Sequence, residues 1–321
     1  MKTYSLQTAT TKRWIAVLFI AGTGLLTGTT AQATLTFTNT FDGTWGSELT
    51  IGQTAVANAE TILSGIFYSP VNVAITFSYG SGPGGGAYAS PNFYNGTSIP
   101  YATLKADLQS ASNTNPANTI LSSLLTHLPV SSPSTIPFLL PSAEAQALGL
   151  GTGGNSSAGT VTVGNGSTWD PTESDGITAN QGDLTGVLMH EISHVLGRVD
   201  YSFASQPPPD LTPLDLSRYS VPAGTFNFTN SNAVFSIDGG ATSLADYSPT
   251  SDTGDWGGVQ TASNDANNAF FSYGTTLQWT AVDTKVMQAQ GWETTAPEPG
   301  SITLALLGGL GLLNFRRRAR L

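Results

Sequence analysis

The segment from Asp183 to Asp200 constrains this chain more than any other, because it predicts a buried helix with two histidines on one face. Apolar residues recur in it at helical spacing: Leu184, Val187, Leu188, Ile192, Val195 and Leu196. His190 and His194 are four residues apart, so their imidazoles project from the same side, about one turn apart. Asp183 is an N-cap residue type, and Gly197 can end the helix in a left-handed conformation. A buried imidazole pair is costly without a partner, and a metal ion satisfies both rings.

The same segment contains the pattern H-E-x-x-H-x-x-G-x-x-D, formed by His190, Glu191, His194, Gly197 and Asp200. Two histidines, one carboxylate and an open position are the ligand set of a hydrolytic zinc ion. Glu191 would lie close enough to take a proton from the water that such an ion activates. A turn at Gly197 would bring Asp200 back toward the histidines. The alternative is a helix with two solvated histidines that ends at a glycine.

This eleven-residue stretch resembles the motif of the metzincin zinc endopeptidases in its aspartate form, as in snapalysin-like proteases. The resemblance implies His190, His194 and Asp200 as zinc ligands and Glu191 as the general base. It also implies a metzincin-like α+β fold, in which a mixed twisted sheet and an active-site helix lie over a loop-rich C-terminal subdomain. The implied activity is zinc-dependent hydrolysis of peptide bonds.

Metzincins also carry a methionine in a tight turn beneath the zinc, and here the resemblance is weaker. The downstream Met287 is better explained as a core-facing residue of a C-terminal helix that ends at Gly291. The other candidate turn is the segment 214–220. There Tyr219 could reach the metal or the oxyanion, as a tyrosine does in astacin-like and serralysin-like members. The alternative is an ordinary packed tyrosine.

Both ends of the chain are typical of export signals. In residues 1–33, basic residues precede an apolar run at 14–26 and a small-x-small cleavage site, which predicts a secretory signal peptide. Residues 297–321 join Pro-Glu-Pro, an apolar run and an arginine cluster, and resemble the PEP-CTERM sorting signal of Gram-negative bacteria. The resemblance implies a secretion translocon and an exosortase-type enzyme as partners, a transient inner-membrane anchor, and delivery to the cell surface or beyond. A plain C-terminal anchor is the alternative.

The body between these signals, residues 34–296, is expected to be one metalloprotease domain, with an upper subdomain 34–197 and a lower subdomain 198–296. It contains four basic and 20 acidic residues, a net charge of about −16. This charge argues against nucleic acid and against anionic membrane surfaces as partners, because no basic patch exists to meet phosphates. The chain has no cysteine, so the body must rely on its own core rather than on disulfides.

Periodicity predicts the remaining elements of the body. Strands are expected at 35–41, 71–79 and 159–163, and helices at 52–67, 101–111 and 115–127. The strand at 159–163 lies either at the sheet edge, where substrate pairs in metzincins, or inside the sheet.

Outside the zinc motif, His127 is expected to be an exposed histidine near a helix end, with a fourth zinc ligand as the alternative. Four aspartates in a Gly/Asn-rich stretch offer oxygen ligands for calcium, the alternative being solvated loops: Asp246, Asp252, Asp255 and Asp265. A second functional class also stays open, because the Gly, Ser, Thr and Asn content suits a structural or adhesive extracellular-matrix protein with a non-catalytic zinc site.

Overall fold

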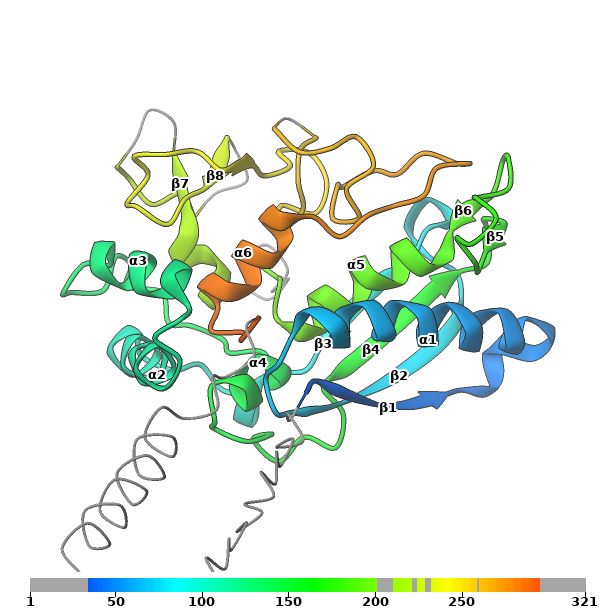
Figure 1. The fold of residues 1–321 in the computed structure, drawn as a ribbon. Helices are drawn as coiled ribbons and strands as arrows, with labels where there is room; N and C mark the ends of the chain where they lie inside the picture. The colour runs from blue at the N-terminus through cyan, green and yellow to red at the C-terminus, as the bar shows by residue number, and fades with distance from the viewer. Residues whose placement is uncertain (1–33, 201–209, 221–223, 229–231, 259, 295–321) are drawn as a thin grey trace, which may run out of the picture. The chain divides into compact units, whose positions relative to one another are not determined.

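The computed structural model describes residues 34–200, 210–220, 224–228, 232–258 and 260–294. The predicted signal peptide and sorting signal lie outside these ranges. The described body is an α+β fold that combines a mixed sheet with several helices (Figure 1). None of the helices within these ranges is both long and apolar enough to cross a membrane.

The main sheet has four strands in the order β1 (Thr36–Phe41), β2 (Asn72–Gly80), β4 (Gly159–Gly164) and β3 (Tyr88–Pro91). The first three are parallel, and β3 runs antiparallel to β4 at the edge. All three predicted strands are therefore confirmed. The strand predicted at 159–163 lies inside the sheet, and the edge beside it belongs to β3, a short strand that periodicity did not predict.

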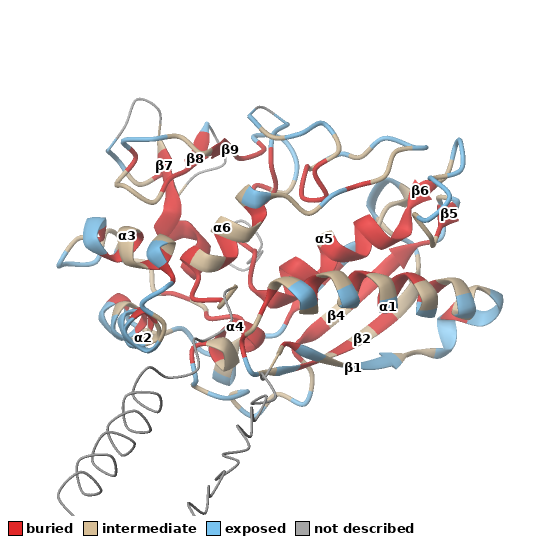
Figure 2. Ribbon diagram, in the orientation of Figure 1, coloured by how far each residue is buried: buried red, intermediate tan, exposed pale blue. Residues whose placement is uncertain are grey.

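Helices α1 (Leu49–Ile66) and α5 (Leu184–Leu196) lie side by side on one face of this sheet (Figure 1). The sheet turns the buried side chains of Val73, Ile75 and Phe77 into the same core as the apolar residues of α5. Helix α5 is buried along almost its whole length, as its apolar pattern predicted (Figure 2).

A buried tryptophan packs between the sheet and the first turns of α1. Trp45 lies in the 3-10 helix η1 (Gly43–Glu48), and its indole N–H donates to the carbonyl of Phe77 at 2.9 Å. Its ring stacks on Tyr79 and lies against Gly52 in the first turns of α1. Gly52 is therefore required by packing, because any side chain there would enter the space of the indole.

A second apolar core forms around α2 (Tyr101–Thr114), α3 (Thr119–His127) and α6 (Ala281–Ala289). It takes residues both from 101–148 and from the chain after 211, so it joins segments from either side of the predicted subdomain boundary at 197/198. The C-terminal helix is confirmed, with Met287 buried.

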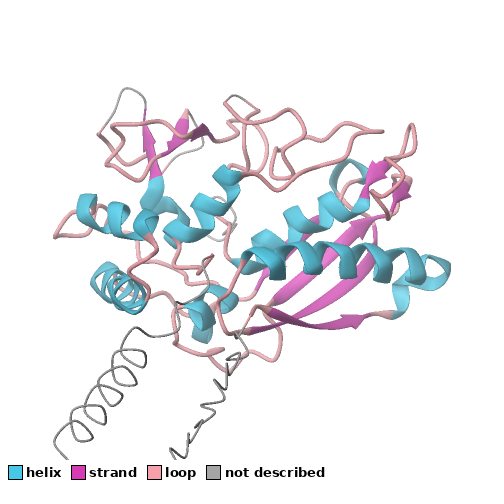
Figure 3. Ribbon diagram, in the orientation of Figure 1, coloured by secondary structure: helices cyan, strands magenta, loops and turns pink. Residues whose placement is uncertain are grey.

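Smaller elements complete the fold. They are η2 (Pro83–Gly85), η3 (Tyr94–Gly96), α4 (Ser142–Ala147), β5 (Trp169–Asp170), β6 (Gly182–Asp183), η5 (Pro213–Ser217), β7 (Arg218–Ser220), β8 (Ala233–Phe235) and β9 (Ala245–Asp246). Strands β7, β8 and β9 form an antiparallel sheet of their own. Between β9 and α6 the described chain is loop with isolated bridges, and this loop passes over α5 (Figure 3).

Two glycines of α1 provide a matched test of this packing. A Cβ at Gly52 would lie 2.3 Å from the indole of Trp45, whereas a Cβ at Gly65 would meet nothing within 4 Å. We expect Gly52→Ala to lower the free energy of unfolding by about 1–3 kcal/mol through overpacking. Gly65→Ala should instead raise it by roughly 0.4–1 kcal/mol, because alanine restricts the unfolded chain and favours the helix. Urea unfolding of both variants measures the difference, and equal effects would contradict the packing.

Candidate metal centre

Helix α5 carries the two histidines of the motif and is held at both ends. One carboxylate oxygen of Asp183 accepts from the backbone N–H of Gly186 (3.0 Å) and the other from that of Leu277 (2.8 Å). At the C-terminus, Gly197 has φ of 124°, and a Cβ there would lie 2.6 Å from a carboxylate oxygen of Glu144. The predicted N-cap and the glycine stop are both confirmed.

The two imidazoles meet above the helix, with His190 Nε2 and His194 Nε2 3.0 Å apart. The other ring nitrogens bond to backbone carbonyls: His190 Nδ1 to Ala266 at 2.8 Å and His194 Nδ1 to Arg198 at 2.6 Å. Burial lowers the pKa of His190 to about 3 and that of His194 to about 4. Both rings are therefore neutral at pH 7.

These bonds determine which nitrogen of each ring carries the proton. A carbonyl can only accept, so each Nδ1 must carry the ring proton. Each neutral ring then has an unprotonated Nε2, and the lone pairs of His190 and His194 face each other. Two acceptors at this distance repel unless a cation lies between them. Backbone carbonyls that orient the ring through Nδ1 are also a common support of metal-bound histidine.

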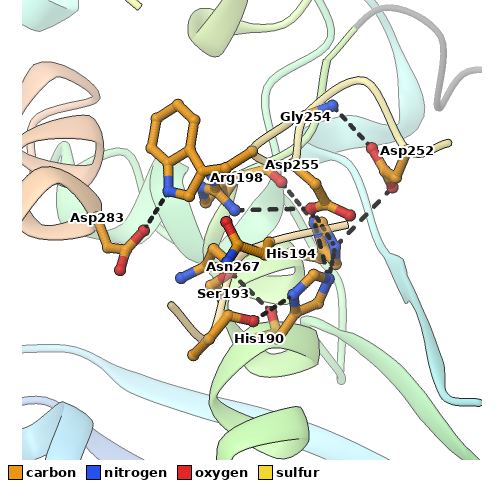
Figure 4. Close-up of polar contacts among 12 residues, drawn as sticks. His190, Ser193, His194, Arg198, Asp252, Gly254, Asp255, Asn267 and Asp283 are labelled. Carbon is orange, nitrogen blue, oxygen red and sulfur yellow. Dashed lines mark hydrogen bonds and ion pairs between the residues drawn. The ribbon is translucent and has the colours of Figure 1, made fainter. Parts of the chain in front are cut away.

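A third potential ligand atom comes from the loop above α5 (Figure 4). Asp255 Oδ1 lies 3.4 Å from His190 Nε2 and 3.5 Å from His194 Nε2. It is buried and accepts no hydrogen bond within the described part of the chain. Tetrahedral zinc with bonds of about 2.0–2.2 Å holds its ligand atoms about 3.3 Å apart. The three atoms therefore fit such an ion.

Two further carboxylates lie beside these atoms. Asp252 Oδ2 is 3.9 Å from His194 Nε2, and its other oxygen accepts from the backbone N–H of Gly254 at 2.8 Å. Glu191 is buried and groups with the two histidines, with ligand atoms within 4.8 Å of one another. Burial first, and then the charge of Asp252, raise the pKa values of Glu191 and Asp255. A cluster of carboxyl oxygens around two neutral imidazole rings favours the binding of a cation among them.

Arg198 interacts both with a histidine of this centre and with Asp255. Its backbone carbonyl holds His194, and its Nη1 lies 3.6 Å from Asp255 Oδ1. The guanidinium is fully buried and stacks on the indole of Trp256, 4.5 Å from the ring centroid. Trp256 in turn donates its N–H to Asp283, which forms the capping box of α6 together with the N-cap residue Thr280, at 2.7 Å (Figure 4). The loop that supplies Asp255 is thus tied to both α5 and α6.

The structure places Asp200, the predicted third ligand, in a different environment. Asp200 is fully buried, and its Oδ2 lies 2.8 Å from Arg218 Nη1 and accepts from the hydroxyl of Thr253. Arg218 also approaches Asp215, at 3.7 Å. Among the residues that the structure describes, the groups of potential metal ligands include Asp255 and leave out Asp200. The turn at Gly197 therefore directs Asp200 to a buried arginine.

Tyr219 and His127 lie outside the centre. Tyr219 is buried against Phe226, with ring centroids 4.7 Å apart, and is not among the residues that line the cleft around the histidines. This position agrees with a packed tyrosine and gives no support to the predicted catalytic role. His127 is exposed at the end of α3 and bonds to the carbonyl of Ser123, in agreement with the expected exposed histidine near a helix end.

The four aspartates considered for calcium do not gather at one point. Asp252 and Asp255 lie at the histidines, Asp246 approaches Ser243 and Gln260, and Asp265 accepts from Thr280. Calcium binding stays a prediction. Sequence reasoning thus did not place Asp255 at the histidines, because an aspartate in a glycine-rich loop has no periodic signal. The only sequence feature that singled out Asp255 was its place among the four aspartates considered for calcium.

The centre lies in a cleft of about 710 Å³. Helix α5 contributes Val187, His190, Glu191 and His194, and the loop above it contributes Asp252 and Asp255. The opposite wall comes from the glycine-rich turn 83–87 and from edge strand β3. A ligand in the cleft would therefore lie between the sheet edge and the loop, directly against the histidines.

No protein-family model, curated protein or solved structure matches this chain in the comparisons. The arrangement of the site therefore has to be interpreted from its own geometry.

Paired substitutions distinguish the two candidate third ligands. We expect Asp255→Asn to weaken zinc binding by more than about a hundredfold. Mutating a residue that only hydrogen-bonds to a metal ligand already lowers metal affinity by about 10–100-fold, and loss of a ligand should have a larger effect. Asp200→Asn should retain zinc but lower the free energy of unfolding by up to about 3 kcal/mol, because it weakens a buried ion pair. Competition with a chromogenic chelator measures affinity, and Asp246→Asn controls for the lost charge. Loss of zinc in Asp200→Asn alone would restore Asp200 as the ligand.

Proposed function

We propose that this protein is a zinc-dependent endopeptidase in which His190, His194 and Asp255 hold the metal. The observation that carries the proposal is the convergence of three ligand atoms, 3.0 to 3.5 Å apart, with Glu191 beside them in a large cleft. Two neutral imidazoles and one carboxylate are a catalytic zinc ligand set that leaves a position open. Bound there, zinc would supply a Lewis acid that makes water a nucleophile near neutral pH.

The residues of the chain would divide the remaining chemistry between them. His190 and His194 cannot exchange protons during the reaction, because their Nδ1–H groups are held by backbone carbonyls. Proton transfer therefore falls to Glu191, which would take a proton from the attacking water and pass it to the departing amine. No covalent intermediate with the protein is needed.

The edge strand supports a peptide as the substrate. Among the strands that the structure describes, β3 pairs with β4 alone, and its residues Tyr88 and Ala89 line the cleft. An extended peptide can add to such an edge through backbone hydrogen bonds, which would present its carbonyl groups to the centre. This geometry favours hydrolysis of a polypeptide over that of a compact small molecule.

These features support a relation to the metzincins with two differences. The third ligand would come from the loop at Asp255, and Met287 lies in α6 rather than in a tight turn. The signals predicted at residues 1–33 and 297–321 would export the enzyme from a Gram-negative bacterium through a secretion translocon and an exosortase-type enzyme.

Glu191→Gln tests the catalytic assignment. The variant keeps the shape of the side chain and leaves all three ligands in place, so we expect it to bind one equivalent of zinc. Because glutamine cannot accept the proton, peptide cleavage should fall by a factor of about 10²–10⁴. Zinc analysis and casein cleavage, with and without a chelator, measure the two properties.

Glu60→Gln on α1 is the matched control, since it makes the same substitution away from the cleft. Full activity in Glu191→Gln would overturn the proposed mechanism. A wild-type protein that binds zinc but cleaves no peptide would instead favour the structural or adhesive matrix protein.

A further inference from the structure

Arg198 carries a buried positive charge that makes no side-chain hydrogen bond. Its side chain is fully buried, and none of its three guanidinium nitrogens has a hydrogen-bond partner in the described part of the chain. Buried polar groups are nearly always hydrogen-bonded, and a buried charge needs a partner of opposite sign. The acidic group within ion-pair distance is Asp255, whose Oδ1 lies 3.6 Å from Nη1 of Arg198 (Figure 4). This separation is longer than the usual N–H···O distance of about 2.7–3.2 Å.

The oxygen that faces Arg198 is the same oxygen that faces the histidines. Asp255 Oδ1 lies 3.4 Å from His190 Nε2 and 3.5 Å from His194 Nε2, and within the described ranges it accepts no hydrogen bond. A group that only supports a metal ligand binds a different atom of that ligand, as the carbonyls of Ala266 and Arg198 do at the two Nδ1 atoms. The guanidinium of Arg198 and a metal ion would instead share one oxygen.

A small rotation of the Asp255 side chain would close the gap to Arg198. The backbone of Asp255 is fixed, because its N–H donates to the carbonyl of Asp252 at 3.2 Å and its carbonyl accepts from the N–H of Ser248 at 2.8 Å. The guanidinium is fixed as well, because it stacks on the fully buried ring of Trp256. The carboxylate is thus the one group of the pair that can move between the two partners.

Like charges disfavour the binding of both partners at once. Zinc and the guanidinium are both cations, and a single carboxylate oxygen would lie between them. Arg198 lies behind Asp255 and is not among the residues that line the cleft, so its charge is poorly screened by water. A metal ion at the histidines should therefore weaken the hold of Arg198 on Asp255, and Arg198 should weaken metal binding by the same factor.

We infer that Arg198 and the metal ion compete for Asp255, and that the arginine is the counter-charge that stabilises the centre while it is empty. Without a metal, Asp255 would close on Arg198, and the acidic residues of the centre would keep one positive charge beside them. With the ion bound, Asp255 would be its ligand, and Arg198 would stay stacked on Trp256. The inference rests on the metal centre of the proposed function and is independent of peptide cleavage.

The zinc affinity of Arg198→Met tests the competition. Methionine fills similar space without a charge, and the substitution leaves in place the backbone carbonyl that holds His194. We expect the variant to bind zinc more tightly than wild type by about tenfold or more, because the competing charge is gone. A residue that only held Asp255 in position would have the opposite effect, a loss of about 10–100-fold. Competition with a chromogenic chelator measures the affinity, and unchanged or weaker binding would overturn the inference.

Thermal unfolding tests the role of Arg198 in the empty centre. With a chelator present, we expect the Tm of Arg198→Met to lie about 6–20 °C below that of wild type, because a buried ion pair has lost one partner. Arg198→Lys keeps the charge and should recover part of this loss. Saturating zinc should raise the Tm of Arg198→Met by more than it raises that of wild type. An Arg198→Met protein that stays unfolded in saturating zinc would rule out the exchange of the two cations.

Arg218→Met is the matched control. Arg218 is equally buried, and its guanidinium lies 4.5 Å from the ring centroid of Tyr247, the same distance as that of Arg198 from Trp256. Its acidic partner is Asp200, which is outside the groups of potential metal ligands in the described chain. We expect this substitution to lower the Tm equally with and without zinc and to leave zinc affinity unchanged. Tighter zinc binding in Arg218→Met as well would show a general effect of charge and contradict the competition at Asp255.

Peptide cleavage by the wild type separates this inference from the proposed function. A wild type that binds zinc but cleaves no casein, together with tighter zinc binding in Arg198→Met, would refute the peptidase and support the competition. Chelator-sensitive cleavage by the wild type without tighter binding in Arg198→Met would refute the competition alone. If neither protein binds zinc, both proposals fail.

Discussion

Two unprotonated imidazole nitrogens facing each other across 3.0 Å are the constraint on which the rest of this structure depends. The contact repels unless a cation occupies the space between the rings, and the surrounding elements all act to preserve it. Gly197 ends α5 three residues after His194, so that the carbonyl of Arg198 can hold that ring. The loop above supplies the carbonyl of Ala266 for the other ring and places the carboxylate of Asp255 within 3.5 Å of both rings.

Two buried arginines determine which carboxylate approaches the histidines. Arg218 pairs with Asp200 at 2.8 Å, and Arg198 lies 3.6 Å from Asp255. Both guanidinium groups are also stacked on aromatic rings, Arg198 on Trp256 and Arg218 on Tyr247. A buried charge needs a partner of opposite sign, so these arginines help to hold the acidic residues beside them in place. The shorter pair holds Asp200 at Arg218, and the longer pair leaves Asp255 within 3.5 Å of both histidines.

The cleft combines this charged centre with an apolar surround, and the combination has a physical consequence. Low-polarity walls strengthen the interaction between an ion and its ligands, because they exclude water that would screen the charges. The same walls remove apolar side chains of a ligand from water, which favours bulky groups near the centre.

The sequence by itself determined the local parts of this protein. Periodicity located β1, β2, β4, α1 and α5 to within a few residues, because alternation and helical spacing reflect which face of an element is buried. The histidine pair, Glu191, the N-cap at Asp183 and the stop at Gly197 follow from the same short-range rules. Only the tertiary structure decided that β3 forms the sheet edge, that Asp200 meets Arg218, and that Asp255 reaches the histidines. These contacts join residues far apart in the chain, and they depend on loop conformation and on the pairing of buried charges, for which no local pattern exists.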